Sequence, residues 1–324
     1  MVNKNRGRYR QSAAKDDKWD AFVIGDILRT DRQRFHPWQP GSELLQQMRA
    51  TVSFHRYLTK QTTSTSNRLR AILLRYYPAA YHLFPSWPSK AGCRFIIQFP
   101  TPEDANRLSI ADFQAFLHNC RHPRQKRWFQ YYQRLQDDYP PSATAPTISY
   151  QREAPLLAQM LQALLQAKQE NVTHLRSLFE QHPDAEIFLS IPGAADFLAP
   201  ALLVKFGEDR ERFPSPAAVQ ALAGTCPVTI QSGKSRSVRF RRACDREFRH
   251  IAQLHARASL RSSAWAGTYY NSTLSRNPSK NHALRCVANR WLKIIWTLWQ
   301  KRTCYDETLH LQHIVRRRSP VPTA

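Results

Sequence analysis

The sequence is poor in glycine, in acidic residues and in long apolar runs. Only 9 of its 324 residues are glycine, whereas 21 are proline. This balance favours helices joined by proline-containing connections over sheet-rich folds with many tight turns. No run of 18 apolar residues occurs, and residues 1–10 are polar and basic, unlike a signal peptide. We therefore expect a cytoplasmic protein that neither spans a membrane nor is exported.

The chain also lacks a C-x-x-C pair. Its six cysteines are too few for a disulfide framework in a chain of this length, which indicates free thiols in a reducing compartment. His118, Cys120 and His122 lie close together in the sequence. No second ligand pair follows at the spacing of a zinc finger, and this disfavours a zinc site there.

Positive charge is the strongest signal that the sequence does contain. Lysine and arginine number 48 against 24 acidic residues, giving a net charge of +24. Such a field attracts polyanions, of which nucleic-acid backbones are the commonest in a cell. Apolar residues make up 42% of the chain, enough for a real core, and its length suggests about two domains.

Apolar spacing predicts mainly helical structure. The predicted helices are Asp16–Arg29, Ser42–Tyr77, Ala111–Cys120, Arg124–Leu135 and Glu153–Gln181. The last of these is either a core helix or a dimerising coiled coil. Phe95–Phe99 is a short buried stretch, Asp137–Pro146 is a linker, and Val228–Ile230 is a short strand or an extended loop.

Asp17 and Asp20 are three residues apart, so a helix places both carboxylates on one face. Converging carboxylates are what a magnesium site for phosphoryl transfer needs. The competing interpretation is structural, because aspartates at a helix start cap backbone amides and suit the helix dipole. The spacing alone favours this second interpretation.

A serine followed by glycine and by basic residues stands at Ser232-Gly233-Lys234. Such a serine on a turn is a candidate nucleophile held against a phosphate, with the cations neutralising developing charge. A polar loop that merely touches phosphate is the simpler alternative. No histidine or carboxylate nearby in the sequence identifies itself as the general base.

A dense basic block follows the serine. It carries only Asp245 and Glu247 as counter-charges, and so much like charge indicates nucleic-acid contact. Phe240 and Phe248 interleave with the block, and we expect them to be core residues rather than platforms for base stacking. The predicted nucleic-acid-binding residues are Lys234, Arg236, Arg239, Arg241, Arg242, Arg246 and Arg249.

Several short motifs then follow one another in a fixed order: Ile191-Pro192-Gly193, Ala221-Leu222-Ala223-Gly224, Gln231-Ser232-Gly233-Lys234, Ser263-Ala264-Trp265-Ala266 and Arg290-Trp291-Leu292-Lys293. This series resembles the carboxy-terminal domain of the insertion-sequence 110 transposases. The stretch Lys15–Ala21 resembles the part of that family around its last two metal-binding aspartates.

The resemblance implies a transposase or site-specific DNA recombinase. Its first domain would be ribonuclease-H-like, as in RuvC-type Holliday-junction resolvases, with four carboxylates (Asp, Glu, Asp, Asp) that bind Mg²⁺. Asp17 and Asp20 match the last two carboxylates, and Ser232 matches the serine that acts as nucleophile on DNA. The family further implies a structured guide (bridge) RNA as partner and a homo-oligomer, either a dimer or a tetramer.

The sequence departs from the family pattern at three places. No acidic residue precedes Asp16, so we expect an amino-terminal part to be missing and this chain alone to be inactive in cleavage. Ala195 stands where the family usually has a second glycine. The segment Ser237–Cys244 lacks the family's glycines, which would strain the backbone if a tight turn were needed there.

The sequence thus predicts a mainly α fold with an α/β part. Residues 1–85 would be a remnant of the RuvC-like domain, 86–182 a helical or coiled-coil connecting region, and 183–324 the carboxy-terminal transposase domain. The alternative function is a non-catalytic basic DNA- or RNA-binding protein left by a decayed insertion element.

Overall fold

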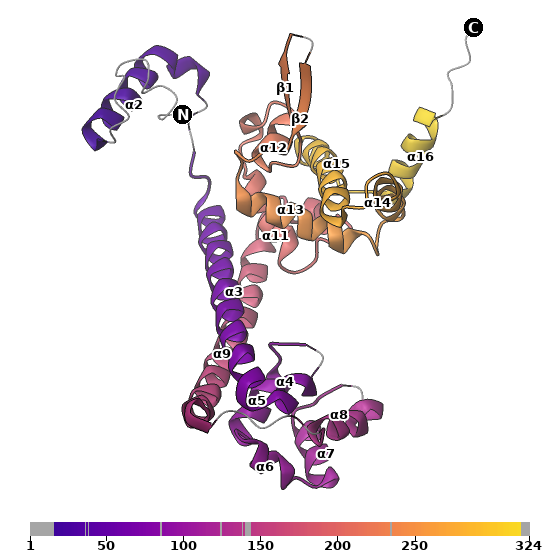
Figure 1. Cartoon of the computed structure of the whole chain (residues 1–324). Helices are drawn as coiled ribbons and strands as arrows, with labels where there is room; N and C mark the ends of the chain where they lie inside the picture. Colours follow the sequence, from indigo (N-terminus) through magenta and orange to yellow (C-terminus); the bar gives the residue numbers. More distant parts are fainter. Residues whose placement is uncertain are drawn as a thin grey trace.

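The computed structural model describes residues 16–35, 37, 39–84, 86–123, 125–137, 139, 144–233 and 235–318. The fold is mainly helical, which confirms the predicted class, and its described sheet is one two-stranded hairpin. All six cysteines are free. Two bodies of short helices are joined by a pair of long helices (Figure 1).

The long pair consists of α3 (Glu43–Tyr76) and α9 (Thr144–Phe179), which run antiparallel as a stalk (Figure 1). Helix α3 begins where predicted, because the Ser42 hydroxyl accepts a hydrogen bond from the Leu45 amide at 3.1 Å. Near one end of the stalk Arg68 binds Glu153 through two hydrogen bonds of 2.7 and 2.9 Å. Helix α9 begins earlier than predicted, inside the expected linker.

One hydrophobic core, the middle core, surrounds the lower end of the stalk and draws on residues 69–161. Its aromatic rings pack edge-on or tilted around the buried Phe95, with centroid distances of 5.3–6.4 Å. The helices that supply it besides the stalk are α4 (Pro78–Leu83), α5 (Lys90–Gln98), α6 (Pro102–Asn106), α7 (Ile110–Asn119) and α8 (Trp128–Leu135). The 3-10 turn η3 (Gln125–Arg127), which has no buried residue, precedes α8.

The predicted buried stretch Phe95–Phe99 lies mostly within helix α5. Ser89 caps this helix by accepting a hydrogen bond from the Gly92 amide at 3.0 Å. Phe95 and Ile96 are fully buried, whereas Gln98 is exposed, so one face of the helix enters the core. Helices α6 and α7 each begin with a capping box, at Thr101 and Ser109.

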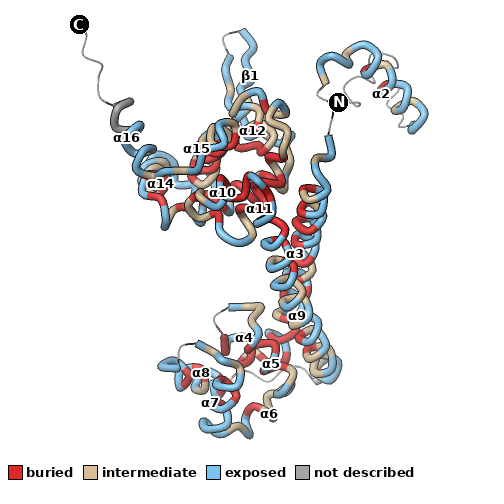
Figure 2. Tube along the Cα trace, turned by 180° about the vertical axis from the view of Figure 1, so that it is seen from behind, coloured by how far each residue is buried: buried red, intermediate tan, exposed pale blue. Residues whose placement is uncertain are grey.

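The second body, the carboxy-terminal core, combines the first turns of α3, the end of α9 and most of the chain after residue 185. Its largest buried side chains include Trp291 and Trp299 of α15, together with Phe206 and Phe248. Buried residues form two zones at opposite ends of the stalk (Figure 2). The helices are α10 (Ala185–Leu189), α11 (Leu198–Phe206), η4 (Arg210–Arg212), α12 (Pro216–Leu222), α13 (Arg246–Ser259), α14 (Ala264–Arg276), α15 (Lys280–Lys301) and α16 (Glu307–Arg318).

Helix α2 (Asp17–Asp31) stands apart from both bodies (Figure 1). It is followed by the 3-10 turn η2 (Arg32–Arg34). The side chain of Asp16 caps α2 by accepting a hydrogen bond from the Lys18 amide at 3.0 Å. The helix predicted at Asp16–Arg29 is therefore confirmed, and the capping role falls to Asp16 rather than to Asp17 or Asp20.

Candidate nucleic-acid interface

A β-hairpin projects from the carboxy-terminal core (Figure 1). Ser232 lies in its last residue pair before the loop. Strand β1 (Val228–Ser232) pairs antiparallel with β2 (Ser235–Arg239), and Ser232 lies opposite Ser235. The predicted strand is thus confirmed. Gly233 begins the two-residue loop with φ +53°, a backbone conformation that glycine adopts without strain. Ser232 is exposed, and Lys234 lies outside the described residues.

The register of the hairpin sorts the predicted site residues onto two faces. Side chains alternate along a strand, and directly opposite partners share a face. Since Val228 pairs with Arg239, one face carries Val228, Ile230, Ser232, Ser235, Ser237 and Arg239. The other face carries Thr229, Gln231, Arg236 and Val238. Ser232 and Arg239 therefore share a face, whereas Arg236 points to the opposite side.

A cavity of about 660 Å³ lies at the base of the hairpin on the Ser232 face. We call it the hairpin pocket. Its lining residues are Val228, Ile230, Arg239, Phe240, Arg241, Arg242 and Ala243. The pocket therefore combines apolar side chains from the hairpin with three guanidinium groups from the predicted basic block.

The basic block keeps its positive charge because its two carboxylates are engaged elsewhere. Lys205 Nζ lies 2.9 Å from Asp245 Oδ2 and 2.8 Å from Glu247 Oε2. Burial alone would raise the pKa of Asp245, but hydrogen bonds from the Phe248 amide and from Lys205 outweigh it and lower the pKa. Within the described chain, no carboxylate lies within ion-pair distance of the block's arginines, namely Arg236, Arg239, Arg241, Arg242, Arg246 and Arg249.

The two aromatic residues of the block have different roles. Phe248 is fully buried in the carboxy-terminal core, as predicted, whereas Phe240 is 45% exposed. The guanidinium carbons of Arg249 and Arg285 lie 4.4 and 4.7 Å from the centroid of the Phe240 ring. This is cation–π distance, so the prediction of a core role for Phe240 is wrong.

Arg285 was not among the predicted binding residues. It lies on α15, far from the basic block in sequence, and only the fold brings it to Phe240. No periodicity or charge cluster would have singled it out.

A close approach of two chain segments explains why the family motif Ala221-Leu222-Ala223-Gly224 ends in glycine. The φ of Gly224 is +62°, and a Cβ there would lie 2.5 Å from Arg249 Nη2 and 2.7 Å from the Cβ of Cys244. Any side chain would therefore collide with the segment that leads out of the hairpin. In contrast, the strain expected at Ala195 and in Ser237–Cys244 is absent, because none of these residues has a positive φ.

The predicted metal-binding aspartates lie away from the serine. Asp17 and Asp20 are one turn apart on α2, whereas Ser232 is on the hairpin, and the two elements are well separated (Figure 1). Two nearby carboxylates suit a hard cation such as Mg²⁺, which keeps several waters and takes substrate phosphates as further ligands. In the described part of the chain no group of three or more His, Cys, Asp or Glu side chains gathers into such a site.

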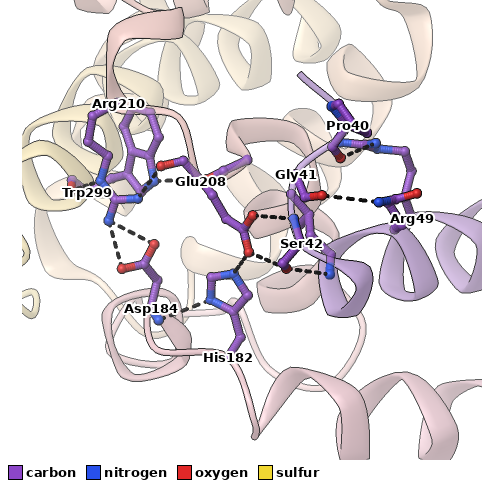
Figure 3. A network of polar contacts seen from close by, with 12 residues as sticks. Pro40, Gly41, Ser42, Arg49, His182, Asp184, Glu208, Arg210 and Trp299 are labelled. Carbon is purple, nitrogen blue, oxygen red and sulfur yellow. Dashed lines mark hydrogen bonds and ion pairs between the residues drawn. The ribbon is translucent and has the colours of Figure 1, made fainter. Parts of the chain in front are cut away.

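A network of polar contacts fixes the start of α3 against the carboxy-terminal core (Figure 3). Glu208 accepts hydrogen bonds from the amide and the hydroxyl of Ser42 at 2.7 and 2.6 Å. The buried His182 accepts from the Asp184 amide at Nδ1, so Nε2 carries the proton and donates to Glu208 at 3.1 Å. Asp184 in turn binds Arg210 through two hydrogen bonds of 2.7 and 2.8 Å. The carboxy-terminal core therefore fixes the position of Ser42, from which the chain leads back to α2.

Comparison with known proteins agrees with these motifs. A family model described as a transposase matches residues 1–78, and the model of the IS116/IS110/IS902 transposase family matches residues 185–271. Together the two stretches make up just over half of the chain. The chain belongs to the IS110 family of transposases.

Relatives of this transposase are similar over most of its length. A Streptomyces coelicolor protein described as a mini-circle transposase for IS117 is 29% identical over 93% of this chain and 74% of its own length. The 43.6 kDa protein of insertion element IS110 from the same organism is 26% identical over 91% and 73%. The 42 kDa protein of IS900 from Mycobacterium paratuberculosis is 26% identical over 94% and 76%.

The family assignment indicates a DNA-binding protein. Among the described residues no helix has the length and apolar character needed to cross a membrane. The two matched stretches fall inside the first and the third predicted domains. The domain boundaries themselves stay a prediction, and both hydrophobic cores draw on α3 and α9.

Proposed function

We propose that this transposase binds nucleic acid through the β-hairpin and the basic block at its base. We further propose that Ser232 is the nucleophile in DNA strand cleavage and joining. The observation that carries the proposal is the exposed Ser232 on the hairpin face that also bears the uncompensated Arg239. Guanidinium groups placed beside the attacked phosphate would stabilise charge as it develops.

The covalent step would exchange one phosphate ester for another. The Oγ of Ser232 attacks the phosphorus of a DNA phosphodiester, a phosphoserine ester forms, and the bond to one deoxyribose oxygen breaks. That oxygen leaves as a hydroxyl after taking up a proton. The serine proton needs an acceptor, and within the described chain no histidine or carboxylate is hydrogen-bonded to Ser232.

Asp17 and Asp20 are the residues that would hold Mg²⁺, which supplies charge neutralisation at the phosphate when bound. They lie apart from Ser232 in the single chain, so the reaction site has to be completed by movement of α2 or by a second copy. We therefore expect the purified chain, as a monomer, to bind DNA without cleaving it in Mg²⁺.

A homo-oligomer is supported by exposed apolar side chains along the stalk. Phe54 and Tyr57 of α3 stack on each other at a centroid distance of 6.2 Å and are 49% and 54% exposed. On α9, Leu156 and Met160 are 60% and 54% exposed and lie one turn apart. The predicted structured guide RNA would be a second polyanion for the basic surface.

Salt titration is the experiment that tests the binding proposal. We expect affinity for labelled duplex DNA and for structured RNA to fall steeply with salt, because each phosphate contact releases counterions. A preference for structured RNA over duplex would support the guided mechanism. Salt-insensitive binding, or none, would overturn the proposed interface.

Cleavage is tested separately with supercoiled DNA in Mg²⁺. No nicking is expected below the concentration at which the chain associates. Nicking that appears on association can be tested by mixing Ser232→Ala and Asp17→Ala chains. If the site is shared between copies, the mixture should show activity that neither variant shows alone. Nicking by Ser232→Ala alone would show that Ser232 is not the nucleophile.

The second candidate function is nucleic-acid binding without catalysis. The observation that favours it is the separation of α2 from the hairpin. It predicts the same salt dependence as the first proposal, but no nicking at any protein concentration.

A further inference from the structure

The hairpin pocket lies on the same face as Ser232. The proposed chemistry uses its arginines but gives no role to the apolar side chains that line it. We propose that this pocket receives one unpaired nucleotide of the DNA strand on which Ser232 acts. The base would lie against Val228 and Ile230, and its phosphates would contact Arg239 and Arg242. The inference rests on the proposed function and adds a subsite to it.

The chemistry of the lining fits a nucleotide better than any other common ligand. Ile230 and Phe240 are 46% and 45% exposed on a projecting element, and such exposed apolar surface usually marks a binding site. The pocket contributes no carboxylate, which disfavours a basic peptide or a metal ion. Apolar walls with cations at the rim match a base joined to a phosphate.

Two buried donors at the pocket lack acceptors. Nε of Arg241 and Nε of Arg249 are buried, and neither has a hydrogen-bond partner among the described residues. Buried donors normally have an acceptor, because a buried donor without a hydrogen bond costs free energy. Arg241 lines the pocket, and Arg249 stacks on Phe240, which also lines it. An incoming anion would satisfy such donors.

The spacing suits a nucleotide next to the attacked bond. Ile230 and Ser232 are two residues apart on one strand face, which corresponds to roughly 7 Å. Stacked DNA advances about 3.4 Å per nucleotide along one strand, so the pocket lies within about two nucleotides of the phosphate at Ser232. A base reaches the pocket only when it is unpaired, because a paired base is held inside the duplex stack.

The opposite hairpin face provides an internal control. Val238 is 62% exposed and is even more accessible than Ile230, yet neither it nor Arg236 lines the pocket. An effect of general hairpin disruption would appear equally for substitutions on both faces. An effect of the pocket would appear for Ile230 alone.

The test compares two short duplexes, one fully paired and one with a single unpaired 2-aminopurine. The full chain should prefer the bulged duplex by at least about fivefold, the low end of what one base contact contributes. Emission of 2-aminopurine should also change on binding. Ile230→Trp fills the pocket and should remove both effects, while Val238→Trp should keep them.

The outcomes separate this inference from the proposed function. Equal affinity of the unsubstituted chain for the two duplexes would overturn the pocket and leave the DNA-binding proposal standing. Equal loss in Ile230→Trp and Val238→Trp, with circular dichroism unchanged, would overturn the assignment to one face. Absence of binding to either duplex would overturn the proposed function together with the pocket.

Discussion

The two hydrophobic cores differ in how they treat polar groups. The buried polar and charged side chains of the described chain lie on the stalk or in the carboxy-terminal core, among them His182, Asp184 and His255. The middle core beyond α3 and α9 buries apolar and aromatic side chains and Cys93. Buried hydrogen bonds demand specific partners, whereas apolar packing tolerates many substitutions of similar volume.

This contrast agrees with the distribution of family motifs. The matched stretches end at residue 78 and resume at 185, so they omit nearly all of the middle core. In the carboxy-terminal core the motif residues have specific partners. His255 Nε2 lies 3.1 Å from the Pro192 carbonyl, and a Cβ at Gly193 would lie 2.6 Å from the Ser259 amide nitrogen. The core that positions the hairpin is therefore the more constrained one.

The largest expected effect comes from emptying the middle core. Phe95→Ala removes a fully buried ring that contacts several other rings, and should cost about 3–5 kcal/mol of unfolding free energy. Urea unfolding measures this cost. If the middle core takes no part in DNA binding, folded Phe95→Ala molecules should bind DNA with unchanged affinity. The affinity is measured at urea concentrations below the unfolding transition.

The matched control for this substitution is Phe129→Ala in α8, whose side chain is 54% exposed. Its unfolding free energy should change by less than about 0.5 kcal/mol. A loss of DNA affinity in folded Phe95→Ala, beyond that of the control, would show that the middle core takes part in binding.

Acid should destabilise the carboxy-terminal core first. Burial lowers the pKa of His255 to about 4, from an ordinary value of 6.5. The unfolded chain therefore takes up a proton between these values while the folded chain does not, and stability falls as pH drops from 6.5 toward 4. The difference amounts to roughly 3 kcal/mol at the low end of this window.

His255→Gln should reduce this pH dependence, because the amide retains a donor for the Pro192 carbonyl but does not titrate. The remainder should come from His55 of α3, whose pKa burial also lowers to about 4. Hydrogen exchange resolved by peptide can follow both cores from pH 7 to pH 4. In the middle core, burial raises the pKa of Cys93 to about 11, so the contribution of this thiol to stability persists in acid and is lost as pH rises above 9. Simultaneous opening of both cores in acid would contradict the comparison.

The sequence predicted those parts of the fold that local signals encode. The long helices and their start at Ser42 were predictable, because capping and apolar spacing are local signals. The hairpin strand was also found locally, from Val228 to Ile230. The resemblance to the transposase family pointed to Ser232, which spacing alone left ambiguous.

Long-range features escaped prediction because no local pattern encodes them. The stacking of Arg285 on Phe240 and the binding of Asp245 by Lys205 join residues about 40 or more positions apart. The same reason explains why Arg236 was grouped with Arg239, although the register places them on opposite faces.

The smallest expected effect tests whether charge acts locally or over the whole surface. Arg242→Ala at the hairpin pocket removes one phosphate contact and should reduce the slope of log K against log salt by about 0.9. Arg107→Ala removes a likewise exposed charge from the body around the middle core and should leave the slope unchanged. Equal reductions would mean that nucleic acid follows the net charge of +24 over both bodies. A reduction confined to Arg242→Ala would place the bound backbone at the hairpin, because a counterion is released only where a phosphate is neutralised.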